Sequence, residues 1–209
     1  MTTAHYLLDS VGLWADIRCE RPVEPGPILF VDRDGVLIED RGYVGTAAET
    51  RVYPGAADAV AAARAMGYRV AIATNQSGIA RGLYDWTGFA AVQAVIDAAL
   101  ARAGTAVDAV LACAYYDEGN GVYAVADHPW RKPRAGMILE GLRRLNGVAR
   151  HSAMVGDQPI DIAAARAAGL GRAVLIDREQ TAAGAAAGAD AVACSLGDAL
   201  KNILHAGLT

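Results

Sequence analysis

Short apolar runs alternate along this chain with longer alanine-rich stretches, and no other feature constrains the fold as strongly. Short apolar runs between turn residues are typical of buried parallel strands, whereas alanine favours helix and packs closely on a sheet. The alternation predicts an α/β fold in which a parallel sheet is sandwiched between helices. The predicted strands are Ile28–Asp32, Arg69–Thr74, Ala109–Tyr115, Ser152–Gly156, Ala173–Asp177 and Ala191–Cys194. The predicted helices are Ala56–Met66, Trp86–Ala103, Ala135–Leu145, Pro159–Ala168 and Leu196–His205.

The chain has 209 residues, which is enough for one domain with a sizeable core. Residues 1–27 contain Pro22, Pro25 and Pro27 and are predicted to form an N-terminal arm. Residues 28–209 are predicted to form a single domain, since neither an internal repeat nor a low-complexity linker divides them.

The composition excludes several classes of function. Hydrophobic residues make up 54% of the chain and charged residues 20%, which indicates a folded globular protein. A net charge of −4 argues against nucleic acid as a partner, although local basic residues could still bind an anionic small molecule. Cys19, Cys113 and Cys194 form no disulfide framework. With neither a signal peptide nor an apolar run of membrane-spanning length, we expect a cytoplasmic location and no membrane partner; the oligomeric state stays open.

Two carboxylates follow the first predicted strand in the segment Asp32-Arg33-Asp34-Gly35-Val36. Alternate residues of a strand point the same way, so Asp32 and Asp34 are expected to converge on one ligand. Converging carboxylates repel each other unless a cation lies nearby or one carries a proton. The spacing does not match a calcium-binding EF-hand loop. The pair therefore indicates a magnesium-dependent site, while an ordinary polar strand end would explain the segment alone equally well.

Three further strand ends carry polar side chains. Thr74-Asn75-Gln76-Ser77-Gly78 follows the second strand, Arg131 and Lys132 lie in the loop after the third, and Gly156-Asp157 ends the fourth. Ligands of such folds gather at the carboxyl ends of the parallel strands. All four segments are therefore expected on one rim, and this coincidence is more specific than any single motif.

These side chains suit the transfer of a phosphoryl group. Asp32 could attack phosphorus and Asp34 could move the proton, while Asp157 would complete a Mg²⁺ site. Lys132 would place a point charge on the phosphoryl oxygens, and Arg131 a planar fork on the substrate. Asp161 could help to orient this site. Taken singly, Gly156-Asp157 could be a common turn, Asp161 could favour the start of a helix, and the two basic residues could be solvated loop charges.

Thr74 and Asn75 offer a hydroxyl and an amide to phosphate oxygens, beside backbone N–H groups at the start of a turn. Ser77 or Asn75 could equally cap a short helix.

In this order the four segments resemble the motifs of the haloacid dehalogenase superfamily of aspartyl-phosphate phosphatases, over nearly all of residues 28–177. The strings TNQSGIARG and RKPRAGM resemble the branch that contains the D-glycero-D-manno-heptose 1,7-bisphosphate phosphatases and the histidinol-phosphate phosphatases. The resemblance implies a Rossmann-like fold with little or no cap domain.

The resemblance also implies roles for individual residues. Asp32 would be the nucleophile and Asp34 the acid and base, with Mg²⁺ held by Asp32, Asp34 and Asp157. Thr74 and Lys132 match the positions that stabilise the phosphoryl group. The expected substrate contacts are Asp40, Arg41, Gly42, Tyr43, Asn75, Gln76, Ser77 and Arg131.

Two departures from the family's pattern limit the transfer. Many members carry a structural zinc on a Cys-x-His and Cys-x-Cys loop, whereas this chain has Cys113, Tyr115, His128 and Trp130 at those positions. Only two good ligands remain, and Asp117 or Asp127 would have to supply the others. We therefore expect the loop to be held by packing of Tyr115, Tyr116, Tyr123 and Trp130 instead of zinc. Gln158 stands where sugar-phosphatase relatives commonly have lysine, which leaves the substrate open.

The expected function is a Mg²⁺-dependent phosphatase that acts on a small phosphorylated metabolite through an aspartyl-phosphate. The favoured substrate is D-glycero-D-manno-heptose 1,7-bisphosphate, which would lose its 7-phosphate, and histidinol phosphate is the alternative. A binding module that keeps the fold without catalysis, and a phosphoryl-accepting receiver domain, fit the motifs less well.

Overall fold

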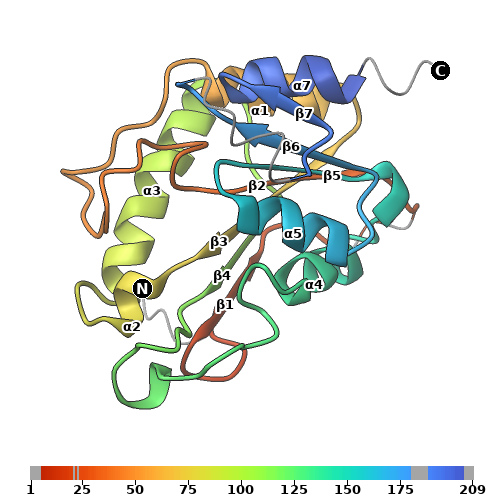
Figure 1. Ribbon diagram of the computed structural model, residues 1–209. Coiled ribbons are helices and arrows are strands. Elements are labelled where there is room, and N and C mark those ends of the chain that lie inside the picture. The colour runs from red at the N-terminus through yellow and green to blue at the C-terminus, as the bar shows by residue number, and fades with distance from the viewer. Residues whose placement is uncertain (1–5, 21, 23, 180–187, 205–209) are drawn as a thin grey trace.

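A seven-stranded sheet forms the centre of the protein, and helices cover both of its faces (Figure 1). The computed structural model describes residues 6–20, 22, 24–179 and 188–204. The strands lie in the order β1-β4-β3-β2-β5-β6-β7. Their bounds are Leu13–Ile17 (β1), Ile28–Val31 (β2), Arg69–Asn75 (β3), Ala109–Cys113 (β4), Ala153–Gly156 (β5), Arg172–Ile176 (β6) and Ala191–Ala193 (β7). All neighbouring strands are parallel except β1, which runs antiparallel to β4.

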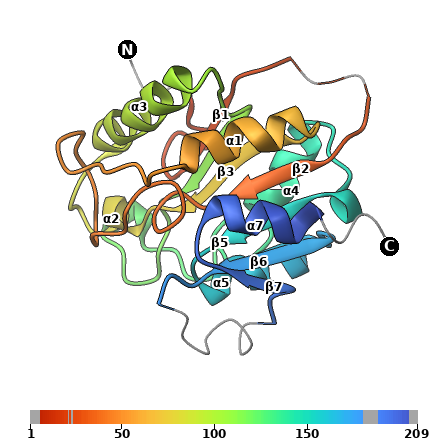
Figure 2. The same cartoon turned by 90° about the horizontal axis from the view of Figure 1, so that it is seen from above.

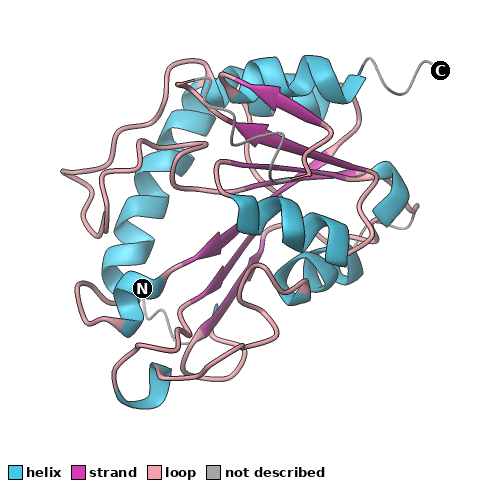
Figure 3. Cartoon of the chain, in the orientation of Figure 1, coloured by secondary structure: helices cyan, strands magenta, loops and turns pink. Residues whose placement is uncertain are grey.

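The helices divide between the two faces of the sheet, and Figure 3 shows the strands between these two layers. One face packs against α1, α3 and α7, which lie together in Figure 2, and the other face packs against α4 and α5. The helices are Ala56–Ala65 (α1), Ser77–Ala80 (α2), Trp86–Arg102 (α3), Gly136–Arg144 (α4), Pro159–Ala167 (α5) and Leu196–Leu204 (α7).

The central strand β2 shows why its sequence is apolar throughout. Leu29 and Val31 belong to the core cluster under α1, α3 and α7, whereas Ile28 and Phe30 belong to the cluster under α4 and α5. A strand buried on both faces needs apolar side chains at every position. The fold class predicted from the sequence is thereby confirmed. Residues 32–55 and 76–85 contain only turns, isolated β-bridges and the short α2, and thus no cap domain.

One strand was absent from the prediction. Leu13–Ile17, inside the predicted N-terminal arm, forms the edge strand β1 and pairs Leu13 with Cys113 of β4. The predicted third strand also ends earlier, at Cys113 instead of Tyr115. The predicted helix Leu196–His205 is found as Leu196–Leu204, and His205 lies outside the described residues.

No helix in the part of the chain that the structure describes is both long and apolar enough to cross a membrane.

Candidate active site

Lys132 lies at the centre of a buried ionic cluster at the carboxyl edge of the sheet. Its side chain is 1% exposed, and its Nζ lies 3.0 Å from Oδ2 of Asp32 and 2.5 Å from Oδ1 of Asp161. It also donates a hydrogen bond to the carbonyl of Ala73 at 2.8 Å. Burial alone would lower the pKa of Lys132, but the Asp161 and Asp32 carboxylates raise it above its ordinary value. The ammonium group therefore stays charged.

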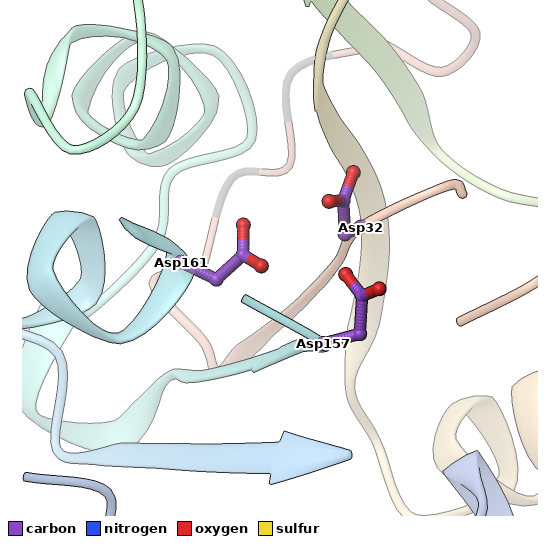
Figure 4. Close-up of side chains that lie close together, drawn as sticks. All are labelled: Asp32, Asp157 and Asp161. Atoms are coloured by element: carbon purple, nitrogen blue, oxygen red, sulfur yellow. The ribbon is translucent and has the colours of Figure 1, made fainter. Parts of the chain in front are cut away.

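Three carboxylates face one another around this lysine (Figure 4). Oxygen atoms of Asp32, Asp157 and Asp161 lie within 4.8 Å of one another. Asp32 directly follows β2, Asp157 follows β5, and Asp161 lies in the first turn of α5. The parallel topology brings them together, because β2 and β5 are neighbours and end at the same edge.

The electrostatics of the three carboxylates favour a cation. Burial raises the pKa of Asp32 to about 7; Lys132 opposes this shift, while the charges of Asp161 and Asp157 add to it. Burial and the charge of Asp161 raise the pKa of Asp157 to about 6. One ammonium does not balance three carboxylates, so the oxygen atoms fit a hard divalent ion such as Mg²⁺.

Asp161 was predicted only as a residue that could orient the site, and its side chain is fully buried beside Lys132. Its Oδ2 also accepts a hydrogen bond from the backbone N–H of Gln158 at 3.0 Å. Gly156 must be glycine, since a Cβ there would lie 2.2 Å from the Cβ of Asp161.

Asp34 is not one of the three grouped carboxylates, although its charge adds to the raised pKa of Asp32. The chain leaves strand geometry after Val31 and turns, with the N–H of Ile38 donating to the carbonyl of Arg33. The carboxylate of Asp34 pairs with the guanidinium of Arg33, which is 1% exposed, at 3.0 Å. Strand alternation therefore does not extend through Asp34, and the convergence of Asp32 and Asp34 on one ligand stays a prediction. The roles of Asp34 as proton carrier and metal ligand stay predictions.

Gly35 lets the turn after Asp32 approach the second acidic motif. Its φ of +75° lies in the left-handed region, which L side chains rarely adopt. A Cβ at this position would lie 2.0 Å from Oδ2 of Asp157. Glycine is thus required both by the turn and by the nearby carboxylate.

The residues of the second motif mainly hold other site residues in place. The amide of Asn75 exchanges two hydrogen bonds with the backbone of Lys132, each of 3.0 Å. Gln76 is 1% exposed; its Nε2 donates to Asp34 at 3.1 Å and to the hydroxyl of Thr74 at 2.9 Å. Its Oε1 accepts a hydrogen bond from Tyr84 at 2.7 Å. The side-chain groups of Asn75 and Gln76 are thus engaged within the protein, and their predicted substrate contacts are untested.

Thr74 and Ser77 take different places. The side chain of Thr74 is buried at the end of β3, whereas Ser77 is half-buried at the start of α2.

A cationic rim lies beside the ionic cluster. The guanidinium groups of Arg81 and Arg131 both stack on the ring of Tyr116, each 4.6 Å from its centre. Arg81 also lies 5.9 Å from the ring centre of Tyr43, in the predicted substrate loop. Arg131 and Lys132 line a shared pocket of about 270 Å³. Arg81 pairs with Glu118 at 3.2 Å and Arg131 donates to the carbonyl of Tyr115 at 3.2 Å. Each guanidinium has five N–H donors, so this rim still offers donors to an anionic group of a ligand.

The predicted substrate loop is exposed at Asp40, Arg41, Gly42 and Tyr43. The carboxylate of Asp40 accepts a hydrogen bond from the N–H of Gly42 at 2.9 Å, which forms a tight turn at the tip. Arg41 and Tyr43 line another pocket, of about 330 Å³. The loop thus stands at the same edge of the sheet as the cluster, and its contacts with substrate stay predictions.

Comparisons with known proteins agree with this architecture. The model of the haloacid dehalogenase-like hydrolase family matches residues 2–169. The D-glycero-beta-D-manno-heptose-1,7-bisphosphate 7-phosphatase of Mesorhizobium japonicum is 42% identical over 178 residues, which are 85% of this chain and 82% of that protein. The enzyme of the same name from Yersinia pestis is 37% identical over 85% of this chain and 95% of its own length.

Two solved structures share the fold. One, from Mesorhizobium loti and described as a HAD-like phosphatase, has a TM-score of 0.83 and 39% identity, and the match covers 95% of this chain and 96% of that one. The D,D-heptose 1,7-bisphosphate phosphatase of B. bronchiseptica, complexed with magnesium and phosphate, has a TM-score of 0.73 and 30% identity, over 86% of this chain and 99% of that one. The chain therefore belongs to the haloacid dehalogenase-like hydrolases.

Proposed function

We propose that this protein is a Mg²⁺-dependent phosphatase that removes the 7-phosphate of D-glycero-β-D-manno-heptose 1,7-bisphosphate. The observation that carries the proposal is the buried cluster in which Lys132 contacts Asp32 while Asp157 and Asp161 lie alongside. Relatives that are 42% and 37% identical over 85% of this chain bear that activity in their names. The solved relative that binds magnesium and phosphate supports the choice of metal.

The reaction would proceed in two steps. An oxygen of Asp32 attacks phosphorus and the bond to the sugar oxygen breaks, while Asp34 gives its proton to that oxygen. Water then attacks the phosphorus of the aspartyl-phosphate, Asp34 takes a proton from the water, and Asp32 and inorganic phosphate are released. Lys132 places its charge against the phosphoryl oxygens in both steps.

Mg²⁺, when bound, would offset the repulsion between the phosphate and the carboxylates. Asp32 and Asp157 would hold the ion, with Asp34 as the third predicted ligand. The position of Asp161 against Lys132 suits a different task, which is to fix the ammonium group beside Asp32.

The cationic rim of Arg81, Tyr116 and Arg131 supports a bisphosphate over histidinol phosphate. A second phosphate would find the guanidinium groups of Arg131 and of Arg81, the latter paired with Glu118. Histidinol phosphate carries an ammonium group, which those same cations would repel. The co-location of Asp32, Lys132 and Asp157 also speaks against a binding module without catalysis.

The test is phosphate release from the heptose bisphosphate and from histidinol phosphate, each with Mg²⁺ and with EDTA. We expect higher kcat/KM for the bisphosphate, no turnover in EDTA, and loss of turnover in Asp32→Asn with the fold retained. Asp58→Asn, on the exposed side of α1, serves as the control for the same change of charge. Arg81→Met should lower the preference for the bisphosphate. A clear preference for histidinol phosphate, or turnover by Asp32→Asn, would overturn the proposal.

A further inference from the structure

The loop between β4 and α4 carries both Arg131 and Lys132, so whatever fixes this loop also positions phosphate-binding charge. At the four positions where the resemblance implies zinc ligands, the chain has Cys113, Tyr115, His128 and Trp130. Cys113 Sγ lies 4.0 Å from Nδ1 of His128. Within residues 6–20, 22, 24–179 and 188–204, the group of three possible metal ligands is the aspartate group of the active site. The zinc-loop residues therefore do not fit a zinc ion.

Tyr115 contacts both His128 and the N-terminal segment. Its ring stacks on that of His128, with the ring centres 4.4 Å apart and the planes inclined by 23°. Its hydroxyl donates a hydrogen bond of 2.5 Å to Oδ2 of Asp9. Burial and this bond raise the pKa of Tyr115, so the hydroxyl keeps its proton and remains a donor. The ring lies close to the backbone of Gly12, where a Cβ would come within 2.7 Å of it.

Asp9 is itself held in place by the start of β1. Its Oδ1 accepts hydrogen bonds from the backbone N–H groups of Val11, Gly12 and Leu13, at 2.9 to 3.0 Å. Strand β1 then pairs with β4 along its length, with Leu13 opposite Cys113. The Asp9 carboxylate thus joins the two parts, because its Oδ1 binds the start of the edge strand and its Oδ2 binds Tyr115.

His128 connects Tyr115 to the loop that carries Arg131 and Lys132. Its Nδ1 accepts a hydrogen bond from the N–H of Trp130 at 3.1 Å, and its carbonyl accepts one from the N–H of Arg131 at 2.9 Å. Burial lowers the pKa of His128, which favours the neutral ring that such an acceptor requires. The guanidinium of Arg131 in turn donates to the carbonyl of Tyr115 at 3.2 Å.

We propose that Asp9 and Tyr115 form a metal-free clamp that takes the place of a zinc ion and positions Arg131 and Lys132. Asp9 and Tyr115 are positioning residues: they act on substrate through the loop and reach no reacting atom. The kinetic readout of the clamp rests on the phosphatase function proposed above, whereas its metal content and stability do not.

The test is a double-mutant cycle of Asp9→Asn and Tyr115→Phe, in which the phenylalanine keeps the stacked ring and removes only the hydroxyl. Each variant should raise KM by about tenfold, the scale of a hydrogen bond to a charged group, and lower kcat by less than about threefold. The double variant should be no worse than either single one, because both remove the same bond. Tyr68→Phe is the matched control, because Tyr68 is half-buried and directly precedes β3, at the end of the strand away from the site.

Metal analysis separates the clamp from zinc. Protein purified without chelators from zinc-supplemented cells should contain no stoichiometric zinc, and a zinc-selective chelator in excess Mg²⁺ should leave activity and melting temperature unchanged. Stoichiometric zinc whose removal lowers activity would overturn the inference. It would also be overturned if the effects of Asp9→Asn and Tyr115→Phe add in the double variant, or if both single variants keep the wild-type KM and melting temperature. If the wild-type protein hydrolyses no phosphate ester, the proposed function fails, and the zinc content and the melting temperatures of the cycle still decide the clamp.

Discussion

Replacing Lys132 by methionine would test the ionic cluster on which the proposed chemistry depends. The chain has two lysines, Lys132 and Lys201, and they differ sharply in environment. Lys132 is 1% exposed between Asp32 and Asp161, whereas Lys201 is 72% exposed beside Asp198. Lys201→Met is therefore a control built into the chain.

The expected cost of Lys132→Met follows from the burial of its partners. Removing one partner of a buried ion pair destabilises a protein by about 3–5 kcal/mol, because the remaining charge is left uncompensated. In a chain of this size, each kcal/mol lowers the melting temperature by about 2–4 °C, which gives a fall of roughly 6–20 °C. The exposed pair of Lys201 should be worth less than about 1 kcal/mol.

The destabilisation by Lys132→Met should also depend on pH, in a direction that the pKa of Asp32 fixes. The pKa of Asp32 is already raised by burial from its ordinary 3.8 to about 7, and loss of the lysine would raise it further. A raised acid pKa in the folded state means that stability is present at low pH and is lost as pH rises through that pKa. The difference in melting temperature between Lys132→Met and wild type should thus be larger at pH 8 than at pH 5.

The assay is thermal unfolding in EDTA at both pH values, with circular dichroism to confirm that each variant is folded. Equal melting temperatures for Lys132→Met and Lys201→Met would refute the reasoning. A difference that shrinks between pH 5 and pH 8 would show that the buried carboxylates are not the partners that matter.

Three further predictions concern other parts of the site. Gly156→Ala should displace Asp161 and lower kcat by about 10²-fold, as displacements near 1 Å can; steady-state kinetics near the wild-type values would contradict it. Gln76→Leu should lower the free energy of unfolding by about 1–3 kcal/mol, because its buried partners lose their hydrogen bonds; urea denaturation measures this change. Burial raises the pKa of Cys113 to about 12, so at pH 8 a thiol reagent should modify the exposed Cys194 and spare Cys113 in the native state; mass mapping that finds Cys113 modified first would show that its surroundings open.

The sequence by itself determined six of the seven described strands and which of them are followed by polar site residues. A run such as Ile28-Leu29-Phe30-Val31 can only be buried on both faces, and carboxylates placed directly after it must lie at the carboxyl edge of the sheet. Local residue type sufficed for Asp32, Asp157 and Lys132, because parallel strands that neighbour each other end together.

The tertiary structure decided what depends on contacts between distant segments. Leu13–Ile17 becomes a strand because β4 offers it an edge, and its own sequence carries no clear period. Asp161 is a buried ion whose cost is offset by Lys132, a partner that the fold supplies. Arg33 pairs with its chain neighbour Asp34, but its burial against Phe89 of α3, like the pairing of Asp161 with Lys132, depends on segments that only the fold brings together.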